Sequence, residues 1–461
     1  MKLVSGFTAS LALVAAHCLV ASQPNIVFVL VDDMGYGDLG VYGNAGVKTP
    51  NLDRLAAEGI LFEQFYATAP ICSPSRAAFI TGQYPQRWKI TSFLSDRAAN
   101  ERRGMANFLG AGAPSLARYL QGAGYATAHF GKWHLGGQRN VDDAPLITEY
   151  GFDESLTQFE GLGDRILPEF SRPMEPNWKD GRHPLGVSSE KLGRGETKFV
   201  PRSSATSVWV ERAIRFMKQS TTANKPFYVN VWPDDPHTPV EPSEAFRGDN
   251  SARSRYLGVL RELDRDLGVL FDFIRQDPAL RGNTLIVFAS DNGPEEGCGS
   301  AGGLRGSKGE LYEGGIREPF IVWAPGLSLP GAQGTRDGKT LIVGHDLVPS
   351  LLRIARVAGP KTVSFDGRDV SEAMLGKGTV DRQAPVFWSR PSGRPVGPIP
   401  LPDLAMREGK WKFLCAKDGT ARELFDLDSD PGETTNLATI QPLVADRMTA
   451  TVLAWQNLIK R

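Results

Sequence analysis

Two apolar segments, each followed directly by a pair of polar residues, constrain the fold more than any other feature of the sequence. The run NIVFVLV ends at Asp32 and Asp33, and the run TLIVFAS ends at Asp291 and Asn292. Neither run alternates between apolar and polar residues, so we expect both faces of each strand to be buried. Such strands are typical of the centre of a parallel sheet that helices cover on both sides.

Segments with helical periodicity lie between the apolar runs, for example PNLDRLAAEGI, APSLARYLQGAG and RYLGVLRELDRDLGVLFDFIRQ. Two further apolar runs, YATAHFG and PFYVNVW, also lead into polar segments. This alternation of strands and helices predicts an α/β fold, with a large mixed, mostly parallel sheet sandwiched by helices. In such sheets ligands bind beyond the carboxyl ends of the strands, where all of these polar segments are expected.

The four strand-end residues are a candidate metal site. If the two strands are neighbours, Asp32, Asp33, Asp291 and Asn292 bring together hard oxygen ligands without sulfur or imidazole, which suits Ca²⁺ or Mg²⁺ better than Zn²⁺. Asp and Asn after a strand are also common turn formers, and for either pair alone this interpretation carries roughly half the weight. The two pairs together favour a metal.

Residues 1–22 have the pattern of a secretory signal peptide. A basic start precedes the apolar run FTASLALVAAHCLVA, and small residues follow it near Ala21 and Ser22. The run is shorter than the ~20 residues that span a membrane, so we expect export to the periplasm or the medium without a membrane anchor. A formal net charge of +0 gives no reason to expect a nucleic-acid or membrane-surface partner.

Cys72 lies in PICSPSRAAFITG, at the start of a predicted helix whose first turn contains Pro74. After removal of the signal peptide only Cys72, Cys298 and Cys415 remain, too few for a disulfide framework. The positive end of the helix dipole is expected to lower the pKa of the Cys72 thiol. From the residues alone, Cys72 is either a thiolate nucleophile or a buried structural cysteine, and the second interpretation is favoured because no histidine lies near it in the sequence.

The segment CSPSR resembles the sulfatase signature Cys-x-Pro-x-Arg, in which a dedicated enzyme oxidises the cysteine to formylglycine, an aldehyde. PNIVFVLVDDMGYGDLG, GYATAHFGKWHLGG, VFASDNGPEEG, GSKGELYEGGIREP and ELFDLDSDPGETTNLA also resemble this family and occur in family order. The resemblance covers nearly the whole mature chain. It implies a sulfuric ester hydrolase of the alkaline-phosphatase superfamily, with a formylglycine diol as nucleophile, a covalent sulfate intermediate, and a formylglycine-generating enzyme as maturation partner.

The resemblance also implies roles for individual residues. One calcium ion, with magnesium as the weaker alternative, would be bound by Asp32, Asp33, Cys72 as formylglycine, Asp291 and Asn292. The catalytic set would be Cys72, Arg76, Lys132, His134, His237 and Lys308. Arg76 would orient the diol and the two lysines would hold the sulfate. His134 would be the base or hydrogen-bond partner of the diol, and His237 would protonate the departing alkoxide. Without the resemblance, a lysine in a Gly-rich loop such as Lys308 is interpreted as a solvated surface residue.

The chain changes character near Val357, where Pro- and Gly-rich connectors begin. We expect residues 23–356 to form the catalytic domain and residues 357–461 a C-terminal α+β subdomain. The short strand candidates PVFWSR, LAMREGKWKFLC and ELFDL and the last helix QPLVADRMTATVLAWQNLIK predict a small antiparallel sheet plus helix. Trp388, Arg390 and Trp411 are weak candidates for sugar contacts.

The expected substrate is a sulfated carbohydrate, because exported sulfatases with long loops resemble those that act on glycosaminoglycans or algal polysaccharides. The basic segments QRWKITSFLSDRAANERRG and NWKDGRHPLGVSSEKLGRGETK would either line a glycan groove or form solvated loops. Aryl and choline sulfates are alternative substrates. A phosphoester or phosphonate ester hydrolase is less favoured because the chain has only 6 histidines for a second metal. A catalytically dead glycan-binding relative is less favoured because the whole catalytic set is present.

Overall fold

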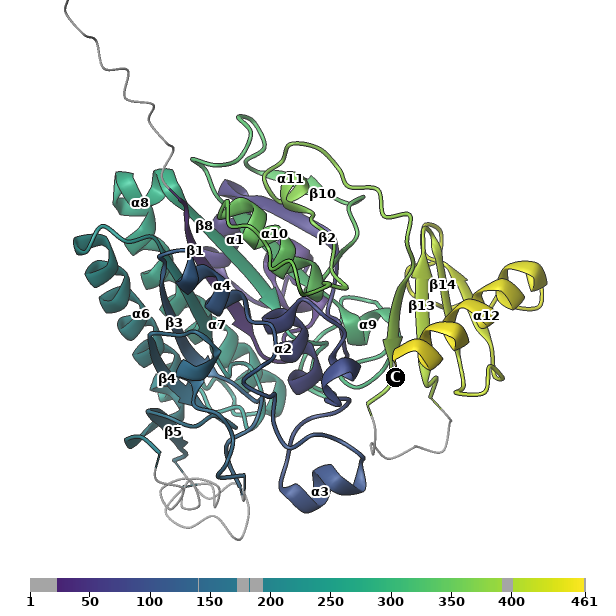
Figure 1. Ribbon diagram of the computed structural model, residues 1–461, viewed down its shortest axis with the longest axis horizontal. Coiled ribbons are helices and arrows are strands. Elements are labelled where there is room, and N and C mark those ends of the chain that lie inside the picture. Colours follow the sequence, from purple (N-terminus) through teal and green to yellow (C-terminus); the bar gives the residue numbers. More distant parts are fainter. Residues whose placement is uncertain (1–22, 140, 172–181, 183–193, 392–400, 460–461) are drawn as a thin grey trace, which may run out of the picture.

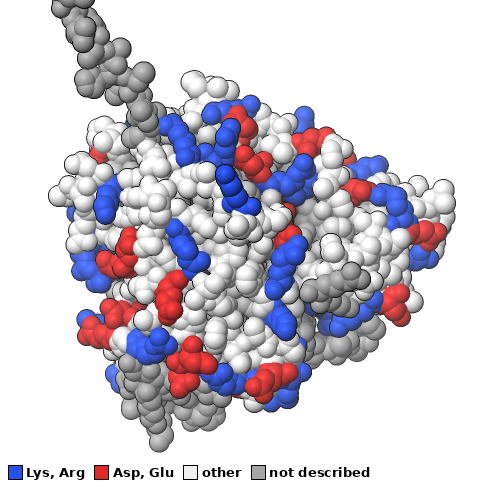
Figure 2. All heavy atoms as spheres, viewed as in Figure 1, with Lys and Arg blue, Asp and Glu red and all other residues white. Residues whose placement is uncertain are grey.

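The computed structural model describes residues 23–139, 141–171, 182, 194–391 and 401–459 (Figure 1). The predicted signal peptide and most of the segment NWKDGRHPLGVSSEKLGRGETK lie outside the described residues. Within the described ranges, no helix has the length and apolar character needed to cross a membrane. On the face drawn in Figure 2, basic and acidic side chains are interspersed, in keeping with the net charge of +0.

A mixed sheet of 11 strands forms the centre of the described structure. Its strands follow one another in the order β10 (Thr335–Asp337), β2 (Ile60–Tyr66), β9 (Arg317–Trp323), β8 (Thr284–Ser290), β1 (Asn25–Val31), β7 (Phe227–Trp232), β3 (Ala126–Lys132), β4 (Glu154–Gln158), β5 (Arg165–Glu169) and β6 (Thr197–Pro201), with β11 (Ile342–Val343) paired to β2. β8, β1, β7, β3 and β4 run parallel. β9 is antiparallel to both of its neighbours. The predicted mixed, mostly parallel sheet is confirmed.

Both faces of the central strand β1 are buried, as its unbroken apolar sequence predicts. Ile26, Phe28 and Leu30 belong to the apolar core on one face of the sheet. Val27 and Val29 belong to the core on the opposite face. Because successive side chains of a strand point to opposite faces, this strand is stable only between two layers of helices.

Helices supply those two layers (Figure 1). One layer contains α2 (Cys72–Thr81), α4 (Leu116–Gly122), α10 (Leu347–Ile354) and α11 (Ser371–Met374). The other contains α1 (Pro50–Glu58), α6 (Ala205–Thr222), α7 (Ala252–Gln276) and α8 (Pro278–Asn283). Two short helices, α3 (Arg97–Arg102) and α9 (Glu313–Ile316), belong to connecting segments.

A second sheet follows near the C-terminus and is antiparallel throughout: β12 (Val386–Ser389), β13 (Leu404–Glu408), β14 (Trp411–Cys415) and β15 (Glu423–Asp426). We call it the C-terminal sheet. One of its faces packs against α12 (Pro442–Ile459), and the other packs against the large sheet. Trp388 lies in this second contact with 0% exposure and donates its indole N–H to the Ala67 carbonyl at 2.8 Å. The idea that Trp388 contacts sugar is therefore wrong; it joins the two sheets.

Candidate active site

The two predicted polar pairs meet at the carboxyl edge of the large sheet. β1 and β8 are parallel neighbours, and their register places Val31 beside Ser290. The next residues, Asp32 and Asp291, therefore leave the sheet side by side, and the Asp291 N–H donates to the Val31 carbonyl at 3.1 Å. Residues far apart in the sequence are brought together by strand register alone.

Asp32, Asp33, Asp291 and Asn292 form a fully buried acidic cluster. Carboxylate oxygens of the three aspartates lie within 4.8 Å of one another, and Asn292 Nδ2 donates to Asp33 Oδ1 at 2.7 Å. Burial and the neighbouring Asp32 carboxylate raise the pKa of Asp291 well above its usual range. Asp32 Oδ1 and Asn292 Oδ1 accept no hydrogen bond from the described residues. A hard divalent cation would balance these carboxylates and take up both oxygens, so the donor set fits Ca²⁺ or Mg²⁺.

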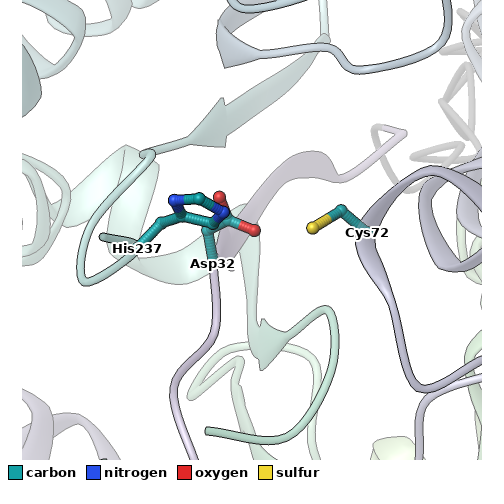
Figure 3. Close-up of side chains that lie close together, drawn as sticks. All are labelled: Asp32, Cys72 and His237. Carbon is teal, nitrogen blue, oxygen red and sulfur yellow. The ribbon is translucent and has the colours of Figure 1, made fainter. Parts of the chain in front are cut away.

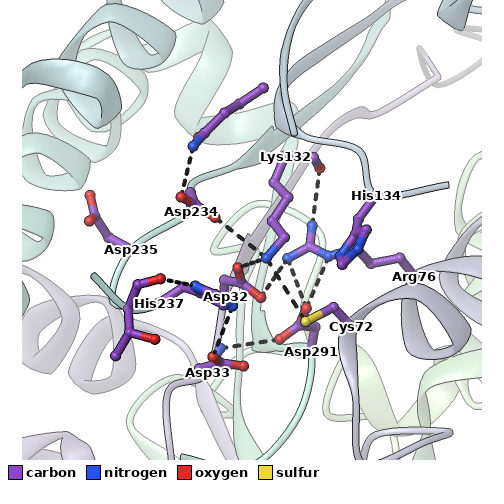
Figure 4. A network of polar contacts seen from close by, with 12 residues as sticks. Asp32, Asp33, Cys72, Arg76, Lys132, His134, Asp234, Asp235, His237 and Asp291 are labelled. Carbon is purple, nitrogen blue, oxygen red and sulfur yellow. Dashed lines mark hydrogen bonds and ion pairs between the residues drawn. The ribbon is translucent and has the colours of Figure 1, made fainter. Parts of the chain in front are cut away.

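Two buried cations contact this cluster next to residue 72 (Figure 4). Arg76, on α2, donates from Nε to Asp291 Oδ2 at 3.0 Å and from Nη1 to the Lys132 carbonyl at 3.1 Å. Its Nη2 lies 2.8 Å from the same Asp291 oxygen as an ion-pair contact. Lys132, the last residue of β3, forms an ion pair with Asp32, and its Nζ lies 3.9 Å from Cys72 Sγ. Although burial raises the pKa of Asp32, the Lys132 ammonium holds it well below its usual range. Positive charge is thus fixed beside residue 72 by two buried side chains.

A third cation and a histidine form the opposite side of the site. Lys308 Nζ donates to Asp33 Oδ2 at 2.5 Å and to Glu295 Oε2 at 2.9 Å, and it lies 3.3 Å from His237 Nε2. His237 Nδ1 is hydrogen-bonded to the carbonyl of Thr238, which only accepts, so Nδ1 carries a proton. The His237 side chain is 27% exposed. Nε2 is therefore the ring nitrogen available for chemistry, on the accessible side of the site.

Cys72 is the first residue of α2, and its side chain points towards Asp32 and His237 (Figure 3). Sγ, a carboxylate oxygen of Asp32 and a ring nitrogen of His237 all lie within 4.8 Å of one another. Burial raises the pKa of the thiol well above its usual range, even though the Lys132 charge lowers it. The predicted lowering of this pKa is therefore wrong, because burial disfavours the charged thiolate and the nearby Asp32 and Asp291 carboxylates disfavour it further. The unmodified thiol is a poor nucleophile.

His134 follows β3 and has a left-handed backbone conformation, with a φ of 54°. Its Nε2 lies 3.3 Å from the Leu94 carbonyl, which only accepts, so Nε2 carries the ring proton. Nδ1 is buried and has no hydrogen-bond partner among the described residues. Burial and the nearby Lys132 charge hold the pKa of His134 well below its usual range. The ring is therefore neutral and keeps an available acceptor on Nδ1.

A family model for sulfatases matches residues 24–357. The chain belongs to the sulfatase family. N-acetylgalactosamine-6-sulfatase from Sus scrofa is 36% identical over 386 residues, which cover 80% of this chain and 68% of that protein. Arylsulfatase A from Bos taurus is 32% identical over 462 residues, which cover 94% of this chain and 86% of that protein. The crystal structure of Ps i-CgsB in complex with k-i-k-neocarrahexaose has a TM-score of 0.76 at 26% identity and covers 93% of this chain and 91% of that chain.

The predicted sulfuric ester hydrolase and its fold are confirmed by these similarities. This sulfatase also brings the predicted site residues to one edge of its large sheet: Asp32, Asp33, Cys72, Arg76, Lys132, His134, His237, Asp291, Asn292 and Lys308. Their roles in the reaction stay predictions.

Sequence reasoning missed two acidic residues of the site. Asp234 accepts from Gln158 Nε2 at 2.8 Å and lies 3.4 Å from Lys132 Nζ. It follows the apolar run PFYVNVW, so the same strand-end rule that identified Asp32 applied to it as well. Glu295, which binds Lys308, lies in an irregular loop, and no local pattern distinguishes it from a solvated glutamate.

Proposed function

We propose that this sulfatase hydrolyses sulfate esters of a carbohydrate and that residue 72 acts as a formylglycine, made by a formylglycine-generating enzyme. The observation that carries the proposal is the place of Cys72, whose Sγ lies within 4.8 Å of Asp32 and His237 atoms and 3.9 Å from Lys132 Nζ. The substrate class is supported by a relative named N-acetylgalactosamine-6-sulfatase and by a similar structure that holds a neocarrahexaose. Export through residues 1–22 is part of the same proposal.

Residue 72, once oxidised and hydrated, supplies a geminal diol, of which one hydroxyl attacks sulfur and the other allows sulfate to leave. A calcium ion held by Asp32, Asp33, Asp291 and Asn292 would add positive charge beside the sulfate oxygens. Calcium is favoured over magnesium because it accepts several protein oxygens in flexible geometry, whereas magnesium usually keeps most of its waters.

The protein's own side chains supply the remaining chemistry. Arg76 and Lys132 place positive charge next to residue 72, and Lys308 does so on the opposite side. This charge is held in a buried site, where it stabilises an increasingly negative transition state more than it would in water. His134 accepts the proton of the attacking hydroxyl on Nδ1, since its Nε2 proton is engaged with a carbonyl. His237 supplies a proton from Nε2 to the departing alkoxide, since its Nδ1 proton is engaged.

Aryl sulfates are a second candidate substrate class, because arylsulfatase A aligns with 94% of this chain. An aryl oxygen leaves more easily than a sugar alkoxide and depends less on a general acid. The accessible position of His237, whose side chain is 27% exposed beside the site, lets it serve a substrate whose leaving oxygen needs a proton.

Mass spectrometry of the peptide that contains residue 72 tests this function. Protein is produced with and without a formylglycine-generating enzyme, and sulfate release is measured from an aryl sulfate and from sulfated mono- and oligosaccharides. We expect the aldehyde mass and sulfate release to occur together and to be absent in Cys72→Ala. Cys298→Ala is the control, because Cys298 is also a buried free cysteine. Sulfate release by protein with an unmodified thiol would refute the mechanism, and release from aryl sulfate alone would refute the carbohydrate substrate.

A further inference from the structure

Lys308 reaches the active site from a loop, residues 305–314, that is closed at its base. The Gly314 N–H donates to the Arg305 carbonyl at 2.7 Å. The approach is so close that a Cβ at Gly314 would lie 2.4 Å from the Gly306 carbonyl oxygen. The two ends of the loop are therefore adjacent, and whatever holds the base also fixes the direction of the loop.

The tip of the loop is hydrogen-bonded to two segments of the active site, the one that follows β8 and the one that precedes Cys72. The Lys308 N–H donates to the Pro294 carbonyl at 3.1 Å, on the segment that follows β8. The Gly309 N–H donates to the Pro70 carbonyl at 2.7 Å, just before Cys72. A shift of the loop would therefore change the distance from Lys308 to both the acidic cluster and residue 72.

An outer contact, made by Arg305, Tyr312 and Glu423, holds both ends of the loop to the C-terminal sheet. Glu423, the first residue of β15, accepts from Arg305 Nη1 at 3.1 Å and from the Tyr312 hydroxyl at 2.8 Å. The Arg305 guanidinium also stacks on the Tyr312 ring, with its Cζ 3.7 Å from the ring centroid. One carboxylate of the C-terminal sheet thus joins the two ends of the loop.

An inner, fully buried contact is made by Glu313, Lys412 and Glu433, and it is joined to the outer one because Arg305 Nη1 also donates to the Glu433 carbonyl at 3.1 Å. Lys412, on β14, donates to Glu313 Oε1 at 2.9 Å and to Glu433 Oε1 at 3.2 Å. The Glu313 N–H donates to Glu433 Oε2 at 2.6 Å, and all three side chains are 0% exposed. Buried charges that are paired in this way resist displacement, because moving one member leaves the others unpaired.

We propose that the C-terminal sheet positions Lys308 for the sulfatase reaction, with Glu423 and Lys412 as positioning residues. This inference rests on the proposed function, in which Lys308 holds the sulfate. A lysine ammonium sits on a flexible four-carbon stem, so its place is defined only when its backbone is fixed. Misplacement of a reacting or binding group by about 1 Å can cost up to about a hundredfold in rate, so the support has direct kinetic consequences.

Glu423→Ala is the appropriate perturbation, because the Glu423 side chain is 23% exposed and its loss leaves no buried charge unpaired. Glu408→Ala is the matched control: it removes a glutamate of the same sheet, 29% exposed and paired with Arg447, away from the loop. We expect kcat/KM for an aryl sulfate to fall about tenfold in Glu423→Ala and to stay within about twofold of the wild type in Glu408→Ala, with similar small changes in Tm. Glu423→Gln keeps an acceptor and should recover part of the loss.

A double-mutant cycle with Lys308→Ala separates positioning from general stability. If the C-terminal sheet acts through Lys308, adding Glu423→Ala to Lys308→Ala causes no further loss of kcat/KM. Multiplicative losses in the double variant, or equal activities of Glu423→Ala and Glu408→Ala, would overturn the positioning role. Full activity of Lys308→Ala would instead overturn the proposed function of Lys308 itself, so the two failures are distinguishable.

Discussion

Replacing Arg76 with methionine tests whether buried charge pairing holds the active site together. Arg76 is 0% exposed; its Nη2 lies 2.8 Å from Asp291 Oδ2 and 3.3 Å from Asp32 Oδ1, and its Nη1 donates to the Lys132 carbonyl at 3.1 Å. Methionine fills much of the same space without charge. Breaking a buried ion pair by removing one partner costs about 3–5 kcal/mol in the free energy of unfolding.

This free energy corresponds to a measurable change in Tm. At about 2.1 cal/mol/K per residue, the unfolding entropy of 461 residues is about 1 kcal/mol/K. Arg76→Met is therefore expected to lower Tm by about 3–5 °C, as measured by circular dichroism at a fixed calcium concentration. Arg76→Lys keeps the charge but loses the planar fork, so we expect an intermediate Tm with reduced sulfate release.

Arg54→Met is the matched control for this experiment. Arg54 also forms an ion pair, with Glu58 at 2.8 Å, but its side chain is 53% exposed. Exposed pairs contribute about 0–1 kcal/mol, which corresponds to a Tm change of about 1 °C or less. If Arg76→Met lowers Tm no more than Arg54→Met does, the buried carboxylates are taking up protons in place of the lost cation, and the reasoning from charge pairing is refuted.

Three further predictions concern the acid, the metal and the pH dependence. His237→Ala should lower kcat more for a sugar sulfate than for a nitrophenyl sulfate, since only the poorer leaving group needs the proton; equal losses would contradict the acid role. Calcium at about 100 times its Kd should stabilise the chelator-treated protein by about 2.7 kcal/mol in thermal unfolding, and Asp33→Asn should weaken that response. Burial raises the pKa of Glu160 from 4.5 to about 7. The protonated Glu160 carboxyl therefore stabilises the folded state fully below about pH 4.5, and this stabilisation is lost as the pH rises through about 7. Glu160→Gln, which stays neutral, should have a higher Tm than the wild type at about pH 8 but not at about pH 4.5.

The sheet and the acidic cluster could be predicted because their signals are local and follow a general rule. An unbroken apolar run identifies a buried strand, and parallel neighbours bring Asp32 and Asp291 to the same edge. The pKa of Cys72 could not be predicted, because it depends on how deeply α2 packs against the sheet, and spacing along the chain does not give this depth. The pairing of Glu313 with Lys412 was equally inaccessible, because 99 residues separate them and neither lies in a metal or nucleophile pattern.

The three cations of the active site differ in how the fold holds them. Arg76 belongs to helix α2 and Lys132 to strand β3, so regular backbone hydrogen bonds fix both positions. Lys308 lies in an irregular loop, where no regular secondary structure fixes its backbone. The shortest ion pair that each cation makes with the cluster is to a different aspartate: Arg76 to Asp291, Lys132 to Asp32 and Lys308 to Asp33. The cation on the loop is therefore the one that needs support from outside the large sheet, and the C-terminal sheet contacts that loop at both ends.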